Sequence, residues 1–268
     1  MPDDLVYSNA IADDFSRAPG TRAKKGTAMT IHMVLQGKGG VGKSFAAALM
    51  AQYLQDAGRQ PVCIDTDPVN ATFAGYAAFG VHAIDLMDGR DINPRRFDLL
   101  VEKIAAASPD QHVIIDNGAS SFLPLADYML SYDVPALLDE LGHELCLHSV
   151  VTGGQAQDDT LHGLLELLEH FAAPVAVWLN PFCGCIEQDG KPFAEMKVYQ
   201  QHRTRLAALV EIPEFNPKTT GHDLSDLLKS KRPFREALAD PKILVMTRQR
   251  LKMAQRELYG RLEQTGLL

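Results

Sequence analysis

The chain has 268 residues, of which 46% are hydrophobic and 22% are charged. This composition excludes wholesale disorder and collagen-like repeats, and the length allows one or two domains with a sizeable core. The net charge of −8 argues against a protein whose main task is to coat nucleic acid, because that task needs many contacts from Lys and Arg to phosphates.

Cysteine content and hydropathy predict a cytosolic protein. Four cysteines in a chain of this length are far fewer than a disulfide scaffold needs, so a reducing compartment is favoured. No apolar run reaches the roughly 18–20 residues that span a bilayer, and the acidic first residues do not have the pattern of a secretory signal. Residues 1–28 have little hydrophobic periodicity and are predicted to be a disordered extension before one domain over residues 29–268.

Strand-length apolar runs alternate with helix-length segments after residue 28. Strands are predicted at Ile31–Gln36, Pro61–Thr66, Gln111–Asp116, Leu145–Thr152, Val175–Asn180 and Leu206–Ile212. Helices are predicted over Gly42–Ala57, Pro94–Ala107, Thr160–Phe171 and from Pro241 to about Gln264, the last with Asp240 as its N-cap. This alternation indicates an α/β fold with a doubly wound, mostly parallel sheet that carries helices on both faces.

A phosphate-binding loop follows the first predicted strand and opens the first predicted helix. Its residues fit the pattern G-x-x-x-x-G-K-[ST] at every fixed position. Glycines let backbone N–H groups surround the phosphates, Lys43 is expected to reach the β- and γ-phosphates, and the hydroxyl of Ser44 is expected to hold Mg²⁺. The loop consists of Gly37, Lys38, Gly39, Gly40, Val41, Gly42, Lys43 and Ser44.

Carboxylates follow two further predicted strands. Asp65 and Asp67 stand at the end of the second strand, and Asp116 ends the strand Gln111–Asp116. Ligands of such sheets bind outside the carboxyl ends of the strands, so all three acids are candidates to face the nucleotide, with Asp116 near Mg²⁺. The alternative for the first pair is an N-cap or Asx turn, and for Asp116 the start of an ordinary loop. Residues 117–121 after it are a candidate flexible switch segment.

The form of the loop, with a second lysine at Lys38, resembles the deviant Walker A loop of ParA/MinD-type ATPases. The resemblance implies that Lys38 crosses a dimer interface to the partner's nucleotide. It also implies that Asp67 orients the attacking water, that Asp65 supports the Mg²⁺ environment, and that Asn180 and the backbone at Pro213 meet the adenine. Phe45 departs from the family, which carries Ser or Thr there against the α-phosphate. No guanine-reading motif is present, so ATP is favoured over GTP.

Longer strings extend the resemblance. The segments IHMVLQGKGGVGKS, CIDTDPVNATF, VWLNPF and MTRQRLK resemble the TraL conjugal transfer proteins of broad-host-range plasmids. This similarity implies a ParA/MinD-like ATPase encoded with a conjugation system, with ATP and Mg²⁺ as cofactors, and it does not say what the ATPase moves or positions. The first of three interpretations is a cytoplasmic, ATP-dependent homodimer that hydrolyses ATP slowly and recruits or positions a protein partner of a conjugation apparatus.

Two other functions stay open at this point. A DNA-partitioning ATPase is weakened by the acidic pI, whereas a non-hydrolysing nucleotide-binding adaptor is kept open by Phe45. The C-terminal helix carries several Lys and Arg residues, and DNA contact or peripheral contact with the inner membrane through it is a less favoured alternative to a docked structural helix. Cys183 and Cys185 lack a second Cys/His pair at zinc-ligand spacing and are interpreted as reduced thiols in a loop.

Overall fold

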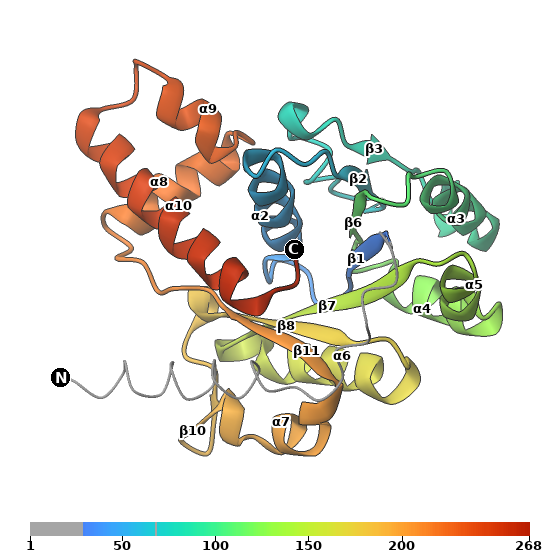
Figure 1. Ribbon diagram of the computed structural model, residues 1–268. Coiled ribbons are helices and arrows are strands. Elements are labelled where there is room, and N and C mark those ends of the chain that lie inside the picture. The colour runs from blue at the N-terminus through green and yellow to red at the C-terminus, as the bar shows by residue number, and fades with distance from the viewer. Residues whose placement is uncertain (1–28, 68) are drawn as a thin grey trace.

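A seven-stranded parallel sheet runs through the computed structural model, which describes residues 29–67 and 69–268 (Figure 1). The strand order is β11-β8-β7-β1-β6-β2-β3, and every pair of neighbours is parallel. This arrangement confirms the predicted doubly wound α/β fold. The predicted disordered extension, residues 1–28, lies outside the described residues.

The seven strands are β1 (Thr30–Val34), β2 (Val62–Asp65), β3 (His82–Ala83), β6 (His112–Asp116), β7 (Glu144–Thr152), β8 (Val175–Asn180) and β11 (Leu206–Glu211). All except β3 coincide closely with predicted apolar runs, because both faces of each central strand are buried. The edge strand β3 consists of two exposed residues and is not predicted. Two short antiparallel hairpins, which the sequence analysis does not predict, lie outside the sheet. They are formed by β4 (Met87–Asp88) with β5 (Asp91–Ile92) and by β9 (Glu187–Gln188) with β10 (Lys191–Pro192).

Helices cover both faces of the sheet, and each face has its own apolar core. One face carries α2 (Lys43–Asp56), α8 (Thr220–Lys229), α9 (Phe234–Ala239) and α10 (Val245–Thr265). The other face carries α3 (Phe97–Ala105), α4 (Phe122–Ser131), α5 (Val134–Glu140), α6 (Gln157–His170) and α7 (Lys197–His202). The helices α4, α5, α7, α8 and α9 are additions to the sequence prediction.

The last helix begins later than predicted. Asp240 does not cap it; instead its Oδ1 accepts a hydrogen bond from the backbone N–H of Lys242 at 2.9 Å in a separate turn. The helix α10 starts at Val245, and Leu244 just before it is 75% exposed. The buried stripe consists of Leu251, Ala254, Leu258 and Leu262. The prediction was wrong because an Asp-Pro pair starts Asx turns as readily as helices.

Strand register gathers the polar strand ends at one edge of the sheet. Asp116 of β6 is paired in register with Val34 of β1 on one side and with Asp65 of β2 on the other. On the other side of β1, Thr152 of β7 is paired with Asn180 of β8. The loop after β1 therefore emerges between two acidic strand ends and two neutral polar ones.

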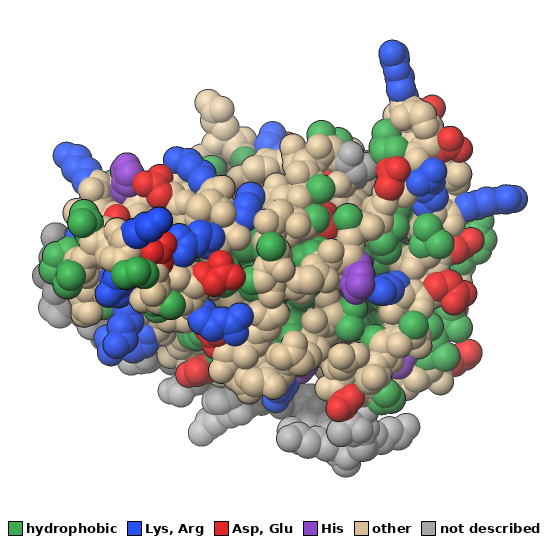
Figure 2. Space-filling model, turned by 90° about the horizontal axis from the view of Figure 1, so that it is seen from above, with side chains coloured by type: hydrophobic (Ala, Val, Ile, Leu, Met, Phe, Trp, Pro, Cys, Tyr) green, Lys and Arg blue, Asp and Glu red, His purple; other side chains and the backbone are tan. Residues whose placement is uncertain are grey.

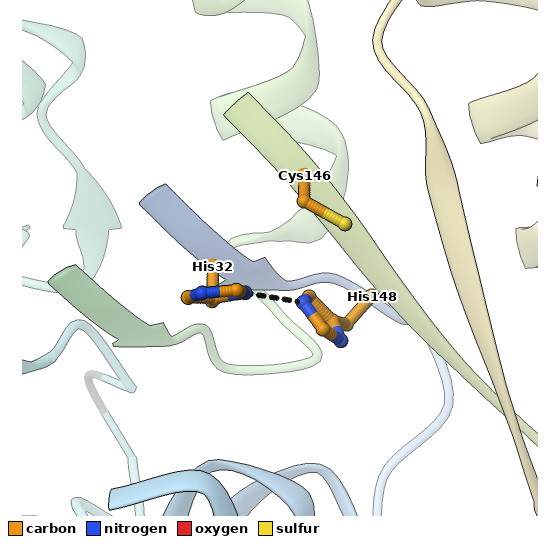
Figure 3. Close-up of side chains that lie close together, drawn as sticks. All are labelled: His32, Cys146 and His148. Carbon is orange, nitrogen blue, oxygen red and sulfur yellow. Dashed lines mark hydrogen bonds between the residues drawn. The ribbon is translucent and has the colours of Figure 1, made fainter. Parts of the chain in front are cut away.

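A chain of three imidazoles, two completely buried and one half-buried, crosses the sheet, and Figure 3 shows its link between His32 and His148. His32 Nδ1 lies 3.0 Å from His148 Nε2, and His32 Nε2 lies 3.1 Å from His112 Nδ1. Trp178 Nε1 donates to His148 Nδ1 at 3.0 Å, and Arg59 Nη1 lies 2.6 Å from His112 Nε2. The chain therefore links four neighbouring strands, β6, β1, β7 and β8.

The buried partner Trp178, and not the exposed Arg59, sets the tautomers of this chain. Because the Trp178 indole is only a donor, His148 Nδ1 accepts and His148 Nε2 carries the proton that is donated to His32. His32 Nε2 then donates to His112, which leaves the Nε2 proton of His112 facing Arg59. Since the guanidinium is also only a donor, this exposed end is a contact between two donors and not a satisfied hydrogen bond. Burial lowers the pKa of His148 to about 3 and that of His112 to about 4, and lowers the pKa of His32 well below its usual range. All three rings are therefore neutral at physiological pH.

These lowered pKa values predict acid-sensitive stability. In the unfolded chain the three histidines have ordinary pKa values near 6.5. The unfolded chain therefore binds protons at a pH at which the folded chain does not. Their contribution is fully present above about pH 6.5 and is lost as the pH falls toward 4, at about 1.4 kcal/mol per pH unit for each histidine. Denaturant unfolding of His112→Gln between pH 6.5 and 4.5 is expected to show a shallower pH dependence than the wild type by about one proton. Equal slopes would show that His112 does not titrate as the burial implies.

Candidate functional site

The loop after β1 has the backbone of a phosphate cradle. Gly40 and Gly42 have φ angles of 76° and 107°, a region that side chains with a Cβ rarely adopt. Gly42 is the N-cap of α2, which begins at Lys43. The first N–H groups of α2 therefore point into the loop, where an anion is stabilised by the helix dipole and by direct hydrogen bonds.

Asn180 fastens this loop to the sheet. Its Nδ2 donates to the carbonyl of Val41 at 2.8 Å, and its Oδ1 accepts from the N–H of Phe182 at 3.2 Å. The carbonyl of Asn180 accepts from the hydroxyl of Thr152 at 2.8 Å. A Cβ on Gly42 would come within 2.8 Å of Asn180 Nδ2, so this approach requires glycine. Asn180, which the family resemblance connects with the adenine, thus lies against the loop and on the wall of the adjoining cavity.

The two loop lysines have different environments. Lys43 Nζ donates to the carbonyl of Lys38 at 2.9 Å, and burial lowers its pKa while Asp116 and Asp67 raise it. Those two carboxylates are therefore close enough to Lys43 to act on its charge. Lys38 Nζ pairs with Asp159 of the same chain at 2.7 Å in an exposed ion pair. The sequence analysis does not identify Asp159; two consecutive acids in the first turn of α6, after a Gly-Gly turn, were the available signal.

The carboxylate of Asp116 is buried and unsatisfied. The residue is 1% exposed, and neither oxygen has a hydrogen-bond partner of ordinary geometry among the described residues. Burial raises its pKa to about 7, and the charges of Asp65 and Asp67 add to this, while the Ser44 hydroxyl and Lys43 lower it. A bound cation would supply the missing partner. An unpaired carboxylate beside a hydroxyl fits Mg²⁺, which prefers oxygen ligands.

Asp65 and Asp67 hold the loop that follows β2. Asp65 accepts hydrogen bonds from the N–H groups of Asp67 and Ala74 at 2.9 and 2.8 Å, one at each oxygen. Asp67 Oδ1 accepts from the N–H groups of Val69 and Asn70 at 2.9 and 3.0 Å. The Asp65 carboxylate thus shapes the loop by binding its backbone N–H groups, and the Asp67 carboxylate closes the turn that follows.

The predicted switch segment packs against this loop. A Cβ on Gly118 would lie 2.8 Å from Asp67 Oδ1, so the two segments touch. Asn117 Oδ1 accepts from the hydroxyls of Thr66 and Ser121, both at 2.9 Å. Asn117 is completely buried and therefore anchors the start of the segment.

A cavity of about 700 Å³ opens beside the loop. This volume lies within the range of small-molecule sites. Phe45, Asn180 and Pro213, which the sequence analysis connected with the nucleotide, all line it, together with Gly40, Gly42, Ile212, Phe215 and Lys229. The structure therefore brings these residues together on one side of the loop and the three carboxylates on the other.

Two sets of potential metal ligands lie elsewhere. His32, Cys146 and His148 have ligand atoms within 4.8 Å of one another (Figure 3). Ligating histidines normally donate their second N–H to an acceptor, but the second nitrogen of His148 accepts from Trp178, so its proton occupies the atom a metal would need. The cluster is therefore better explained as a hydrogen-bonded chain. Cys183 and Cys185 are exposed free cysteines, and their interpretation as reduced thiols stays a prediction.

No helix in residues 29–67 and 69–268 combines the length and the apolar character that crossing a bilayer requires.

The family model of the CobQ/CobB/MinD/ParA nucleotide binding domain matches residues 32–265. Among solved structures, the MinC:MinD cell division protein complex from Aquifex aeolicus aligns with a TM-score of 0.47 at 16% identity. That alignment covers 87% of this chain and 96% of the other.

Two proteins of Escherichia coli, both called Protein TraL, are similar along most of the sequence. They are 53% and 52% identical to it over 240 residues, which is 89% of this chain and 99% of each relative. Such identity over nearly the whole of a relative shows common membership. The chain therefore belongs to the TraL family, within the CobQ/CobB/MinD/ParA class of nucleotide-binding domains.

Proposed function

We propose that this chain is a Mg²⁺- and ATP-dependent molecular switch that hydrolyses ATP slowly, dimerises when ATP is bound, and recruits or positions a protein partner in conjugative DNA transfer. The observation that carries the nucleotide part is the unpaired carboxylate of Asp116 beside Ser44 and Lys43, at the mouth of a glycine-rich loop. The conjugative part rests on the TraL relatives. A cytoplasmic location stays a prediction.

Different residues around the loop would bind the phosphates, the Mg²⁺ ion and the base of ATP. The backbone N–H groups of the loop and Lys43 would hold the phosphates, and Ser44 and Asp116 would hold Mg²⁺. The ion would neutralise phosphate charge and orient the terminal phosphate. The cavity lined by Phe45, Asn180 and Pro213 has room for the base and ribose.

Hydrolysis requires a group that orients water at the terminal phosphate. Asp67 is the candidate, because its charge acts on Lys43 and its carboxylate lies against the switch segment at Gly118. Lys38 is the candidate for contact across a dimer. In the single chain it is paired with Asp159, so crossing to a partner requires that this exposed pair opens, which costs little.

A non-hydrolysing adaptor is the second candidate function. Phe45, in the first turn of α2, is half-buried against the core and lines the cavity, and it has no hydroxyl for the α-phosphate. The most useful experiment is size-exclusion chromatography with and without ATP, with phosphate release measured on the same samples. A switch dimerises and releases phosphate, whereas an adaptor binds ATP without release.

Lys43→Ala is expected to lose ATP binding in a calorimetric titration. Its ammonium and the loop N–H groups share the phosphate charge, and each charge-assisted contact contributes roughly 1.5–3 kcal/mol. Lys38→Ala is the matched control, since its side chain points to Asp159, and it should bind ATP as the wild type does. Unchanged affinity in Lys43→Ala would remove the loop from the proposal.

Asp116→Asn is expected to stabilise the nucleotide-free protein and to abolish the Mg²⁺ dependence of ATP binding. Removing a buried charge whose pKa is raised to about 7 should increase the free energy of unfolding above pH 7 by on the order of 2 kcal/mol. Denaturant unfolding and titration of ATP with and without Mg²⁺ measure the two effects. Stability gained with Mg²⁺ dependence retained would place the ion elsewhere.

Asp67→Ala and Lys38→Ala separate chemistry from switching. Water orientation matters only in hydrolysis, so Asp67→Ala should accumulate as an ATP-bound dimer with little phosphate release. Lys38→Ala should bind ATP as a monomer, because the neighbour's phosphate charge is no longer neutralised across the interface. If Lys38→Ala dimerises as the wild type does, the crossing lysine is wrong. If Asp67→Ala hydrolyses at the wild-type rate, another group orients the water.

A further inference from the structure

The helix pair α4 and α5 exposes an unusual number of large apolar side chains. Leu123 and Tyr132 are 65% and 69% exposed, and three leucines nearby are more than 40% exposed. On α4 the exposed Leu123, Asp127 and Leu130 have helical spacing, so they form a continuous stripe. We call this the α4–α5 surface, which consists of Leu123, Asp127, Leu130, Tyr132, Asp133, Leu137, Asp139, Glu140, Leu141 and Glu144.

The charges on the α4–α5 surface all have one sign. Residues 104–190 contain 13 Asp and Glu residues and no Lys or Arg. Five of these acids are exposed among the apolar side chains of the surface, and none of the five forms an ion pair within the part of the chain that the structure describes. The surface is therefore apolar and uniformly negative.

Most of the compensating charge lies elsewhere in the molecule, and Arg95 and Arg96 lie in a turn that contacts α4. Residues 191–268 contain 15 Lys and Arg against nine Asp and Glu. Figure 2 shows blue side chains gathered at the left, over the end of the molecule that carries α8, α9 and α10, and further blue side chains at the right. The chain thus has a strong charge asymmetry, and the negative surface is not neutralised by the cations that follow it in sequence.

We propose that the α4–α5 surface is the docking site for a basic amphipathic segment of a partner protein. Exposed apolar patches mark interaction sites, and the sign of the charge around a patch selects its partner. A negative surface repels the phosphates of nucleic acids and of anionic lipids. A polypeptide segment with Lys and Arg on one side and apolar residues on the other satisfies both the leucines and the acids.

The docking surface is joined directly to the phosphate loop. The ring of Phe122, at the start of α4, lies against Gly37, where a Cβ would meet it at 3.1 Å. Ser121, just before α4, donates to Asn117, and Gly118 touches Asp67. A nucleotide that moves this segment also moves α4. On the proposed function, ATP therefore changes the affinity of the surface for its partner.

The test uses a labelled synthetic helical peptide with a leucine face and a lysine face, and its glutamate counterpart as the control probe. Fluorescence anisotropy with the full chain, without nucleotide, is expected to show binding of the lysine peptide only. Asp139→Lys/Glu140→Lys is expected to weaken that binding by roughly tenfold or more. Leu137→Ser/Leu141→Ser should weaken it similarly without changing net charge.

The matched control is Glu166→Lys/Glu169→Lys. These two acids are exposed on α6, within the same stretch that lacks Lys and Arg but outside the α4–α5 surface. The control should bind the lysine peptide nearly as well as the wild type. An equal loss of peptide affinity in this variant would mean that the peptide responds only to the net charge of the protein, and the proposal would be overturned. Retained binding in both α5 variants would overturn it as well.

Two further arms separate the remaining outcomes. If the protein self-associates without nucleotide and Asp139→Lys/Glu140→Lys prevents this, the occupant is a second copy and a separate partner is excluded. A change in peptide affinity on adding ATP, lost in Lys43→Ala, would support the link to the phosphate loop. Peptide binding that ignores ATP, in a protein shown by calorimetry to bind ATP, would contradict the link and leave the nucleotide site intact.

Discussion

Burial of the Asp116 carboxylate without a hydrogen-bond partner is the constraint around which the carboxyl edge of the sheet is arranged. Such burial costs several kcal/mol unless the group is protonated or meets a cation. The strand register keeps Asp116 buried, because β6 lies between β1 and β2. Its last residue, Asp116, therefore stays between the loop and Asp65, and the free-energy cost of burying its charge is not relieved. The fold therefore retains a charge that opposes folding at neutral pH, and such retained costs are typical of functional sites.

The imidazole chain on the same sheet is the opposite case. There too polar groups are completely buried, but each ring nitrogen of His32 and His148 has a partner. Lowered pKa values keep the rings neutral, and neutral, hydrogen-bonded groups need no ion. Judged only by the type of potential ligand atoms, His32, Cys146 and His148 would be a better metal site than Asp116 and Ser44. The direction of the hydrogen bonds to the two histidines favours Asp116 and Ser44 instead.

Sequence reasoning recovered what depends on local pattern. The strand Val175–Asn180 was predicted at its observed bounds, and the phosphate loop follows β1 and opens α2, because continuous apolar runs and glycine spacing are local signals. Contacts between distant segments could not be predicted from the sequence. Both oxygens of Asp65 accept hydrogen bonds from backbone N–H groups, Asn180 binds the loop, and Lys38 pairs with Asp159. Each of these contacts depends on the strand order and not on the spacing of residues in the sequence. The helices α4 and α5 were missed because their exposed leucines blur the amphipathic pattern.

Charge distribution limits how a single chain can neutralise a nucleotide. The strands β6, β7 and β8 and the loops that leave their carboxyl ends fall within residues 104–190, which supply no Lys or Arg. Within the loop, positive side-chain charge then comes from Lys43 and from a Lys38 already paired with Asp159, and the adjoining cavity adds Lys229 and Lys231 on its wall. The negative charge of a bound ATP would exceed the positive charge of Lys43 and one Mg²⁺. A lysine contributed by a second copy of the chain would therefore stabilise the bound nucleotide most at this position. The same scarcity of cations leaves the α4–α5 surface negative, so one feature of composition shapes both the proposed dimer and the proposed docking site.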